Sequence, residues 1–222
     1  MHAMKFALSQ LQQVILFAFI AAGCVTVAAN AQTVYNNGTG TNSGYYYSLY
    51  STGGSATMTF PGASQYPGNF QVSWSGVNDV VGGKGWSTGG SRTVNYNVGY
   101  ANGYNNVSVY GWTTNPLVEY YVCEFGSVVN GTYKGSVTSD GHSYSTYLHQ
   151  QVNQPSIQGT ATFNQYLDNW GGSSTGASHA VTTGNHYSHW QSLGMPLGSF
   201  NELIFMAEAW GGKSGGINAT VW

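Results

Sequence analysis

The sequence predicts an all-β protein, a sandwich of two twisted antiparallel sheets, and three observations lead to this fold class. Short segments in which apolar and polar residues alternate follow one another along the chain, with turn-forming residues between them. The 222 residues include 17 tyrosines, seven tryptophans and nine phenylalanines, which favour strands. Only one segment has a convincing helical pattern. Many strands with one helix favour a sandwich whose concave face can form a cleft.

The first 31 residues have the pattern of a secretory signal peptide, so we expect a secreted, extracellular protein. Lys5 gives a basic start, residues 14–22 form an apolar stretch, and Ala29-Asn30-Ala31 is a small-x-small cleavage site. The apolar stretch is too short to span a membrane, and no second one follows it. A lipoprotein signal, in which Cys24 is acylated, is an alternative that fits its surrounding residues less well.

The remainder of the chain predicts a short lead and one domain. Residues 32–43 are polar and rich in Gly, and we expect them to form a flexible segment before the first strand. Residues 44–222 have the size of a single all-β domain. Within them, residues 70–75 and 94–98 alternate in polarity and predict strands. Asp140-Gly141, between two strand-like runs, predicts a hairpin with a type I′ turn.

The single helix is expected near the C-terminus. Thr183 is its candidate N-cap, residues 186–193 carry it, and Gly194 ends it.

The few ionisable residues limit the possible partners and ligands. With five Lys and Arg and a net charge of −2, the chain lacks the basic surface that nucleic acid and anionic membranes require. The histidines lack Cys or acidic residues at metal-ligand spacing, so no metal or other cofactor is expected. Behind the signal peptide only Cys123 remains, which predicts a small packing residue and no intrachain disulfide. We expect a monomer.

The abundant aromatic residues also bear on the ligand. Aromatic rings that stack on sugars, together with many neutral hydrogen-bonding groups, suit an uncharged polysaccharide. The strand propensity of tyrosine and threonine is an equally direct explanation, so composition alone leaves this open.

Two of the seven acidic residues lie among aromatic residues inside strand-like segments. Glu119 shares a strand face with Tyr121, and Glu208 shares one with Glu202. A carboxylate in such surroundings is costly to desolvate and is seldom surface decoration. Two carboxyls with unequal pKa values are the machinery of glycoside hydrolysis. Alternation cannot show that the two glutamates face each other.

At these residues the chain resembles the endo-xylanases of glycoside hydrolase family 11, from about Gly44 to Trp222. The matching runs are 44–48 (GYYYS), 81–86 (VGGKGW), 110–112 (YGW), 115–121 (NPLVEYY), 131–135 (GTYKG), 154–157 (QPSI), 162–166 (TFNQY) and 192–195 (SLGM). The resemblance implies a β-jelly roll shaped like a partly closed right hand. It also implies that xylan binds in the cleft between fingers, palm and thumb.

The resemblance further implies a retaining double displacement. Glu119 matches the nucleophile, and Glu208 matches the acid/base. Such a mechanism requires the two carboxyl groups to lie about 5–5.5 Å apart, against about 6.5–9.5 Å for inversion. Asp79 matches the position beside the acid/base, where Asp accompanies an acidic pH optimum and Asn a neutral one. We therefore expect Asp79 to tune the acid/base and the optimum to be acidic.

The same comparison indicates the residues that bind substrate. They are Tyr50, Tyr110, Trp112, Tyr121, Gln165 and, at the tip of the thumb, Pro155, Ser156 and Ile157. Several positions depart from the family pattern: Tyr50 replaces a stacking tryptophan, Gln151 the thumb arginine and Glu202 a tyrosine; Leu167 to Trp170 and Ala209-Trp210 also differ. These departures put the strength and fine specificity of binding in question, and leave both carboxylates in place.

Several acidic residues have an ordinary structural interpretation. Glu124 is expected on the back face of its strand, Asp140 in a turn and Asp168 in a loop. Glu202 is either a contact in the cleft or a solvated strand end.

Two other functions remain open from the sequence. A non-catalytic carbohydrate-binding sandwich would keep the aromatic residues but would not need Glu119 and Glu208 together. A related jelly-roll hydrolase of cellulose or xyloglucan would use a similar carboxylate pair. Residues 115–121 and the thumb tip at 155–157 favour xylan.

Overall fold

The structure is a computed structural model that describes residues 31–61 and 66–222. The predicted signal peptide, apart from its last residue, and the alternative lipoprotein site at Cys24 lie outside the described residues. None of the helical structure described is long and apolar enough to cross a bilayer.

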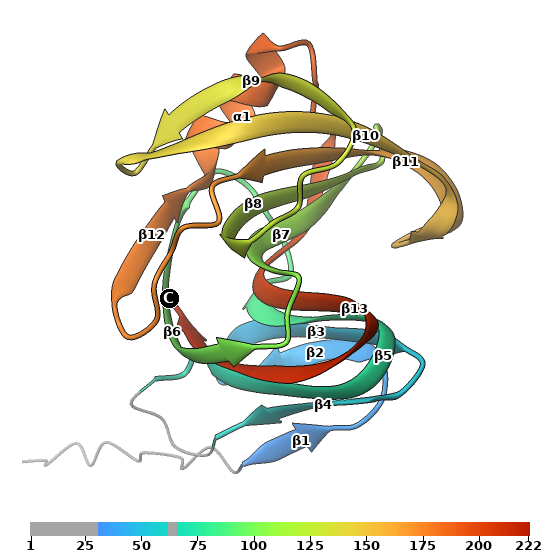
Figure 1. The fold of residues 1–222 in the computed structure, drawn as a ribbon, viewed down its shortest axis with the longest axis vertical. Coiled ribbons are helices and arrows are strands. Elements are labelled where there is room, and N and C mark those ends of the chain that lie inside the picture. Colours follow the sequence, from blue (N-terminus) through green and yellow to red (C-terminus); the bar gives the residue numbers. More distant parts are fainter. Residues whose placement is uncertain (1–30, 62–65) are drawn as a thin grey trace, which may run out of the picture.

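The described chain folds into strands with one helix, as the sequence predicts (Figure 1). The strands are β1 (Gln32–Val34), β2 (Gly38–Asn42), β3 (Tyr45–Thr52), β4 (Ser55–Phe60), β5 (Asn69–Trp86), β6 (Thr93–Asn102), β7 (Asn106–Thr114), β8 (Val118–Gly126), β9 (Thr132–Ser139), β10 (His142–Ser156), β11 (Gly159–Asn169), β12 (Ser178–Thr182) and β13 (Ser199–Val221). The helix, α1, is Thr183–Ser192 and precedes β13.

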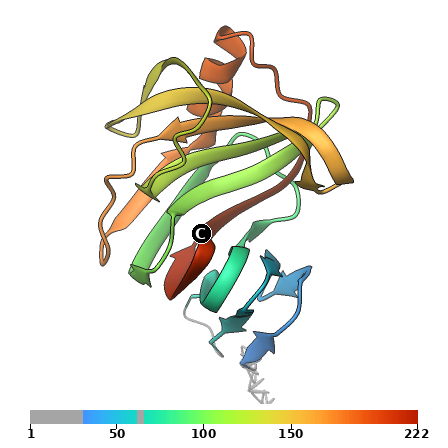
Figure 2. The same cartoon turned by 45° about the vertical axis from the view of Figure 1, so that its right-hand side comes forward.

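The strands form two layers that share β5 and β13 (Figures 1 and 2). The first layer runs in the order β1-β4-β5-β13-β6-β12. The second runs in the order β2-β3-β5-β13-β7-β8-β11-β10-β9. The all-β sandwich is therefore confirmed, with two differences in detail. The layers belong to one continuous 13-stranded sheet, and β8 pairs with β11 in parallel.

Strand β13 passes from one layer to the other because its ladder is interrupted. Its register with β5 shifts between Trp210 and Lys213 and again before Gly215. Gly211 and Gly212 between them have φ values of 76° and 80°, which favour glycine. The residues before this bend pair with β7, and those after it pair with β6.

Alternation along the strands gives the sandwich one core between the layers and another on its concave side. On β8, Val118, Tyr120 and Val122 pack into the core between the layers. Tyr121 packs instead into a smaller cluster on the concave side, which also contains Tyr110, Trp112, Phe163, Leu167, Ile204 and Met206. Nearly every residue of β8 is thus buried, and the two faces differ in what they meet.

The segment at 32–43, expected as a flexible lead, contains two strands. β1 pairs with β4, and β2 pairs with β3. Asn37, between them, accepts the backbone N–H of Ser51 at 2.8 Å and donates to its carbonyl at 2.9 Å. Edge strands of this kind need only their backbone groups to pair, so the polar sequence gave no periodic signal.

The N-cap of the helix lies one residue earlier than the sequence predicts. Thr182 is the N-cap, and its N–H and hydroxyl both donate to Asp140, at 2.7 Å each. Thr183, the expected cap, is the first helical residue, and its hydroxyl accepts the backbone N–H of Arg92 at 3.0 Å. Gly194 follows the helix with a φ of 70°, as expected of a terminating glycine.

The hairpin at Asp140-Gly141 is confirmed. Both residues have positive φ, 52° and 83°, and they join β9 to β10, where Ser139 pairs with His142.

Asp168 is a buried strand residue, which corrects the expectation of a loop. It lies in β11 and is fully buried. Its carboxylate lies 2.6 Å from His186 Nδ1 and accepts bonds from Thr146 Oγ1 at 2.5 Å and Trp190 Nε1 at 3.0 Å. Two of these partners belong to α1, so the carboxylate joins the helix to the sheet. This role could not be predicted from the sequence, because the partners are distant from Asp168 in the chain.

Glu124 lies on the back face of β8 as expected, but it is deeply buried. Tyr96 and Tyr144 donate to its two oxygens at 2.6 and 2.8 Å. Burial raises its pKa to about 7 despite these bonds.

Candidate active site

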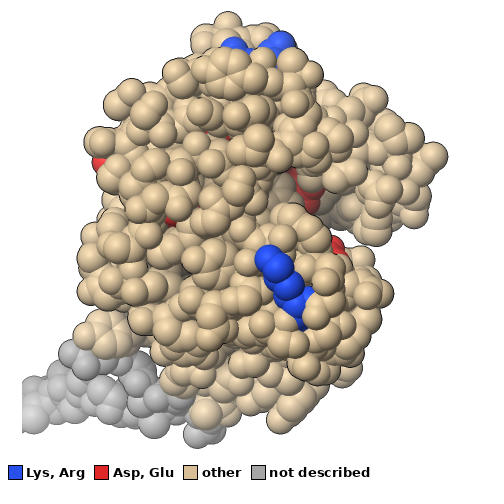
Figure 3. All heavy atoms as spheres, in the orientation of Figure 1, with Lys and Arg blue, Asp and Glu red and all other residues tan. Residues whose placement is uncertain are grey.

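The concave face holds a cleft of about 510 Å³ whose walls come from β3, β5, β7, β8 and β13. The hairpin of β10 and β11 curls over it, on the right of Figure 1. The space-filling view shows a hollow below this hairpin with acidic side chains exposed in it (Figure 3). A second hollow of about 490 Å³ shares Asp79, Tyr121 and Glu208 with the first, so the groove continues on both sides of Glu208.

Glu119 lies on the floor of the cleft with three hydrogen-bond donors around it. Its side chain comes from β8 and is 7% exposed. Tyr110 and Tyr121 donate their hydroxyls to Oε1 at 2.8 and 3.1 Å, and Gln165 donates Nε2 to Oε2 at 2.6 Å. Donors of this kind stabilise the ionised form.

The donors of Glu119 are themselves held in place. Trp112 Nε1 donates to the Tyr110 hydroxyl at 2.5 Å. Gln151 Nε2 donates to Gln165 Oε1 at 3.3 Å, which leaves the Gln165 amide group directed at Glu119. The orientation of Glu119 is therefore fixed by β7 on one side and by the β10–β11 hairpin on the other.

Glu208, from β13, lies close to Glu119 and has fewer donors. Asn106 donates Nδ2 to its Oε2 at 2.7 Å, and Ser108 in turn donates to Asn106 at 2.6 Å. The sequence marks Asn106-Val-Ser only as a glycosylation sequon. Both side chains are fully buried, which makes them support for Glu208 instead. Only the distance from Glu208 in sequence, more than 100 residues, hid this role.

One hydroxyl contacts both glutamates. Tyr121 Oη lies 3.1 Å from Glu119 Oε1 and 3.5 Å from Glu208 Oε1. The two oxygens can therefore be no farther apart than these contacts laid end to end. That limit is compatible with the roughly 5–5.5 Å that separates the carboxyl groups of a retaining pair.

The surroundings give the two carboxyls unequal acidity. The pKa of Glu208 is raised to about 8. Burial is the largest cause, and the charges of Glu119 and Asp79 add to it. Burial also raises the pKa of Glu119, but the bonds from Gln165, Tyr110 and Tyr121 oppose that rise. These surroundings favour the proton on Glu208, and the three donors favour the negative charge on Glu119.

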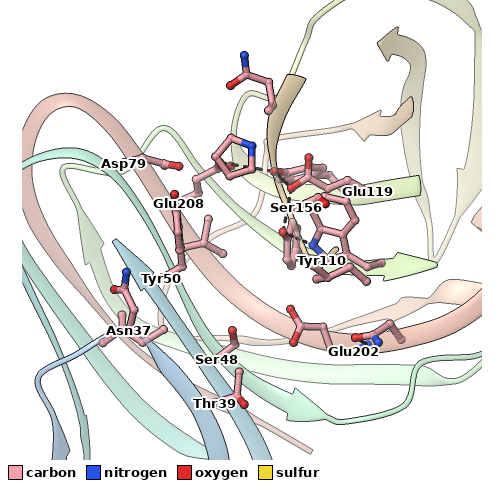
Figure 4. A pocket seen from close by; sticks show the side chains of 18 of the residues that line it. Asn37, Thr39, Ser48, Tyr50, Asp79, Tyr110, Glu119, Ser156, Glu202 and Glu208 are labelled. Atoms are coloured by element: carbon pink, nitrogen blue, oxygen red, sulfur yellow. Dashed lines mark hydrogen bonds between the residues drawn. The ribbon is translucent and has the colours of Figure 1, made fainter. Parts of the chain in front are cut away.

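Asp79 lies beside Glu208 in the cleft (Figure 4). Strand β5 carries it, and its neighbour across the ladder is Trp210. Burial raises the pKa of Asp79. No hydrogen bond joins it to Glu208 among the described residues, and its buried Oδ1 has no partner there. When Asp79 is ionised, its nearby negative charge raises the pKa of Glu208.

The structure brings all the residues expected to bind substrate to the cleft. Tyr50 on β3 pairs with Val81 on β5, and Val81 pairs in turn with Glu208 on β13. Tyr110, Trp112, Tyr121 and Gln165 form the network around Glu119. Pro155, Ser156 and Ile157 line the cleft from the tip of the β10–β11 hairpin.

Glu202 is a cleft residue, which decides between the two interpretations that the sequence left open. It is 7% exposed and accepts the hydroxyl of Tyr46 at 2.5 Å. Figure 4 shows it beyond Tyr110 as seen from Glu119, on the side away from Asp79.

Comparisons with known proteins agree with this geometry. A sequence profile described as "Glycosyl hydrolases family 11" matches residues 42–220. The "Endo-1,4-beta-xylanase B" of Phanerodontia chrysosporium is 46% identical over 190 residues, which make up 83% of this chain and 63% of that protein. The "Ethylene-inducing xylanase" of Penicillium digitatum is 44% identical over 216 residues, 91% of this chain and 96% of that protein. The chain thus spans just under two thirds of the first relative and nearly all of the second.

A solved structure supports the fold. A chain from a structural comparison of two endo-1,4-β-xylanases of Trichoderma reesei superposes with a TM-score of 0.65 and 37% sequence identity. The superposition covers 88% of this chain and 99% of the other.

Proposed function

Because this chain belongs to glycosyl hydrolases family 11, we propose that it is an endo-1,4-β-xylanase that cleaves internal bonds of the xylan backbone. One observation carries this proposal. A buried carboxyl and a half-buried one, both within reach of the Tyr121 hydroxyl, lie on the floor of a groove with unequal numbers of donors.

We propose a retaining double displacement for the reaction. The Glu119 carboxylate attacks the anomeric carbon while Glu208 gives its proton to the leaving glycosidic oxygen. A covalent xylosyl-enzyme results. Glu208, now ionised, takes a proton from water, which attacks the same carbon and releases Glu119. The raised pKa of Glu208 suits the acid, and the three donors to Glu119 suit the nucleophile.

We propose an acidic pH optimum set by Asp79. The active form is one in which Glu119 is ionised and both Asp79 and Glu208 carry protons. Burial raises the pKa of Asp79, but from a lower starting value than that of Glu208. In this proposal the activity falls as pH rises and Asp79 loses its proton.

The wider proposals rest on the sequence pattern and on the groove. We propose that residues 1–31 direct secretion, that residues 44–222 are the catalytic domain, and that the enzyme acts as an extracellular monomer. Tyr50 stacks on the sugar near the cleavage point, and the thumb tip at 155–157 closes over the chain. No nucleic acid, membrane or cofactor takes part.

Release of reducing sugar tests the activity. Xylan, carboxymethyl-cellulose and xyloglucan are compared, with Glu119→Gln and Glu208→Gln as controls. We expect release from xylan and a loss of at least about 10³-fold in each variant. Binding of xylan without release would favour a carbohydrate-binding protein. Faster release from cellulose or xyloglucan would favour a related glucanase.

The stereochemistry tests the mechanism separately. Proton NMR of the first products is expected to show the β-anomer of the new reducing end. Initial formation of the α-anomer would mean inversion and would overturn the role of Glu119 as nucleophile.

A further inference from the structure

Glu202 is a carboxylate of the cleft that the proposed reaction does not use. It lies on the same face of β13 as Glu208, six residues earlier, which is about 20 Å along an extended strand. It therefore faces a part of the bound chain that lies away from the cleaved bond. Tyr46 donates to its Oε2 and holds the side chain in place.

The second oxygen of Glu202 is free to meet a ligand. Oε1 accepts no hydrogen bond from the residues that the structure describes, and the side chain lines the cleft. A sugar hydroxyl in the cleft can donate to it without displacing a protein group. Burial raises the pKa of Glu202, and the bond from Tyr46 opposes that rise. Once Glu202 is ionised, a negatively charged group at the same place meets a held anion.

The cleft carries no positive charge to offset its acids. Its described lining includes four carboxyls, those of Asp79, Glu119, Glu202 and Glu208, and no Lys or Arg. Gln151, on the thumb side, is neutral. Figure 3 agrees, since the basic side chains visible in it lie away from the hollow.

Three basic side chains are held by other groups, and one of them, Lys213, donates to the carbonyl of Tyr104 at 3.1 Å. Lys84 is buried, donates to Asn42 and to the carbonyl of Pro67, and lies over the ring of Phe60. Arg92 stacks on Trp86, 4.3 Å from the ring centre.

We propose that Glu202 makes this cleft selective against xylan that bears acidic substituents. It accepts a hydroxyl of the unsubstituted backbone through Oε1 and repels the carboxylate of a uronic acid branch. This inference rests on the proposed xylanase function and names its preferred substrate: xylan whose backbone and side groups are neutral.

The physical reason is the sign of the field in a narrow, poorly solvated groove. Walls of low dielectric focus the field of the acidic side chains into the groove. Placing a like charge against a held anion costs far more there than in open water. Neutral branches of equal size do not meet this penalty.

The test compares two polymers that differ in charge alone. One is glucuronoxylan, and the other is the same polymer after chemical reduction of its carboxyl groups, which keeps each branch as a neutral sugar. For the native enzyme we expect kcat/KM to be about tenfold higher on the reduced polymer at low ionic strength. The ratio should shrink in 0.5 M salt, since screening weakens the repulsion. Equal rates on both polymers would overturn the proposal.

Glu202→Gln assigns the effect to this residue. It keeps the shape and an acceptor oxygen but removes the charge, so the ratio between the polymers should fall toward one. We expect at most a few-fold loss on unsubstituted linear xylan. Asp140→Asn, which removes an acid outside the cleft, should leave the ratio as in the native enzyme. A ratio unchanged by Glu202→Gln would assign the discrimination to other carboxyls and refute the role of Glu202.

Failure of the underlying function would be visible on its own. Hydrolysis of unsubstituted linear xylan reports the xylanase activity without any uronic acid. The inactive Glu119→Gln protein can be tested in parallel for affinity to the two polymers by gel electrophoresis. A preference for the reduced polymer in binding, lost in the Glu119→Gln/Glu202→Gln protein, supports the selectivity, whereas equal binding refutes it.

Discussion

Three glutamates of this molecule have the same side chain and three different roles, and their neighbours account for the difference. Glu119 receives three donors, which favour its ionised form against the effect of burial. Glu208 has one amide donor and a raised pKa of about 8, which suits an acid. Glu124 is enclosed by two tyrosines on the far side of β8 and faces no cleft. The number and direction of donors thus distinguish the proposed nucleophile, the proposed acid and a structural group.

Tyr110→Phe should impair the reaction without unfolding the protein. The change removes one donor to Glu119 and leaves Trp112 Nε1 without its acceptor. A hydrogen bond to a charged group is worth about 1.5–3 kcal/mol, so kcat/KM on xylan should fall about 10- to 100-fold. Tyr166→Phe is the matched control, because that hydroxyl donates to Pro196 outside the cleft. Full activity of Tyr110→Phe would mean that Glu119 does not depend on this donor.

Asp79→Asn should move the alkaline limb of the pH–rate profile to higher pH. In the proposed active form Asp79 is protonated, and an amide stays neutral at every pH. The limb would then follow the loss of the proton from Glu208. If Asp79 acts only as a nearby anion, its removal lowers the pKa of Glu208 and the limb moves to lower pH. The profile of kcat/KM between pH 3 and 9 distinguishes the two directions.

At this scale the sequence predicted residues that the structure gathers in one cleft, but not those that support them. The position of Glu119 and Glu208 among aromatic residues was informative, and the family motifs gave each a role. Asn106 and Ser108 carried no such signal, because their importance comes from contact with a glutamate on another strand. Glu202 could be read either way until the fold placed Tyr46 beside it.

Among the elements, the long strand β13 shows how far the alternation of polarity predicts structure. Alternation on β13 correctly put Glu202 and Glu208 on one face with Ile204 and Met206. It could not predict that the strand changes layer at Gly211 and Gly212, because those glycines have no side chain to reveal a face. The order of the strands also depends on pairings between distant segments, such as β13 between β5 and β7.

Asp168→Ala should loosen the attachment of α1 to the sheet. The change leaves His186, Trp190 and Thr146 without their shared acceptor in the core. Removing one partner of such a buried pair costs about 3–5 kcal/mol, so Tm should fall by roughly 6–20 °C.

Its control is Asp140→Ala, which removes the exposed acceptor of the helix cap and should cost about 1 kcal/mol. Both variants should keep native kcat at 25 °C, since neither residue lines the cleft. An Asp168→Ala protein as stable as the native one would mean that the pair contributes nothing net to stability.

Across the whole molecule, the acidic residues lie in the interior or in the cleft, and only Asp140 among the seven is largely outside. The composition contains few charged residues, and it suits a neutral ligand without establishing one. It could not predict that the remaining acids are gathered inside, because burial is decided by the packing of the two layers. That arrangement has a consequence for stability.

The protein should be more stable at mildly acidic pH than at pH 8. The pKa of Glu124 is about 7 in the folded protein, above the value of an unfolded glutamate. Between those values the folded state holds more protons than the unfolded state, so the free energy of unfolding falls as pH rises. Glu208, whose pKa is about 8, acts in the same direction.

Glu124→Gln isolates one contribution to this trend. A glutamine cannot titrate, so up to about 3 kcal/mol of the decline in stability between pH 5 and 8 should disappear. Urea unfolding at several pH values measures it, with Asp140→Asn as the control for net charge. A decline of the same size in Glu124→Gln would show that this carboxyl does not ionise within that range.

The sharing of β5 and β13 by both layers has a mechanical consequence. Neither layer is a separate body, because each contains part of the same two backbones. Pulling one layer apart takes hydrogen bonds from the other, so the sandwich has no weak plane along which it could open in halves. Heat or denaturant should therefore melt both layers in a single cooperative step, and the groove that depends on them should vanish in that same step.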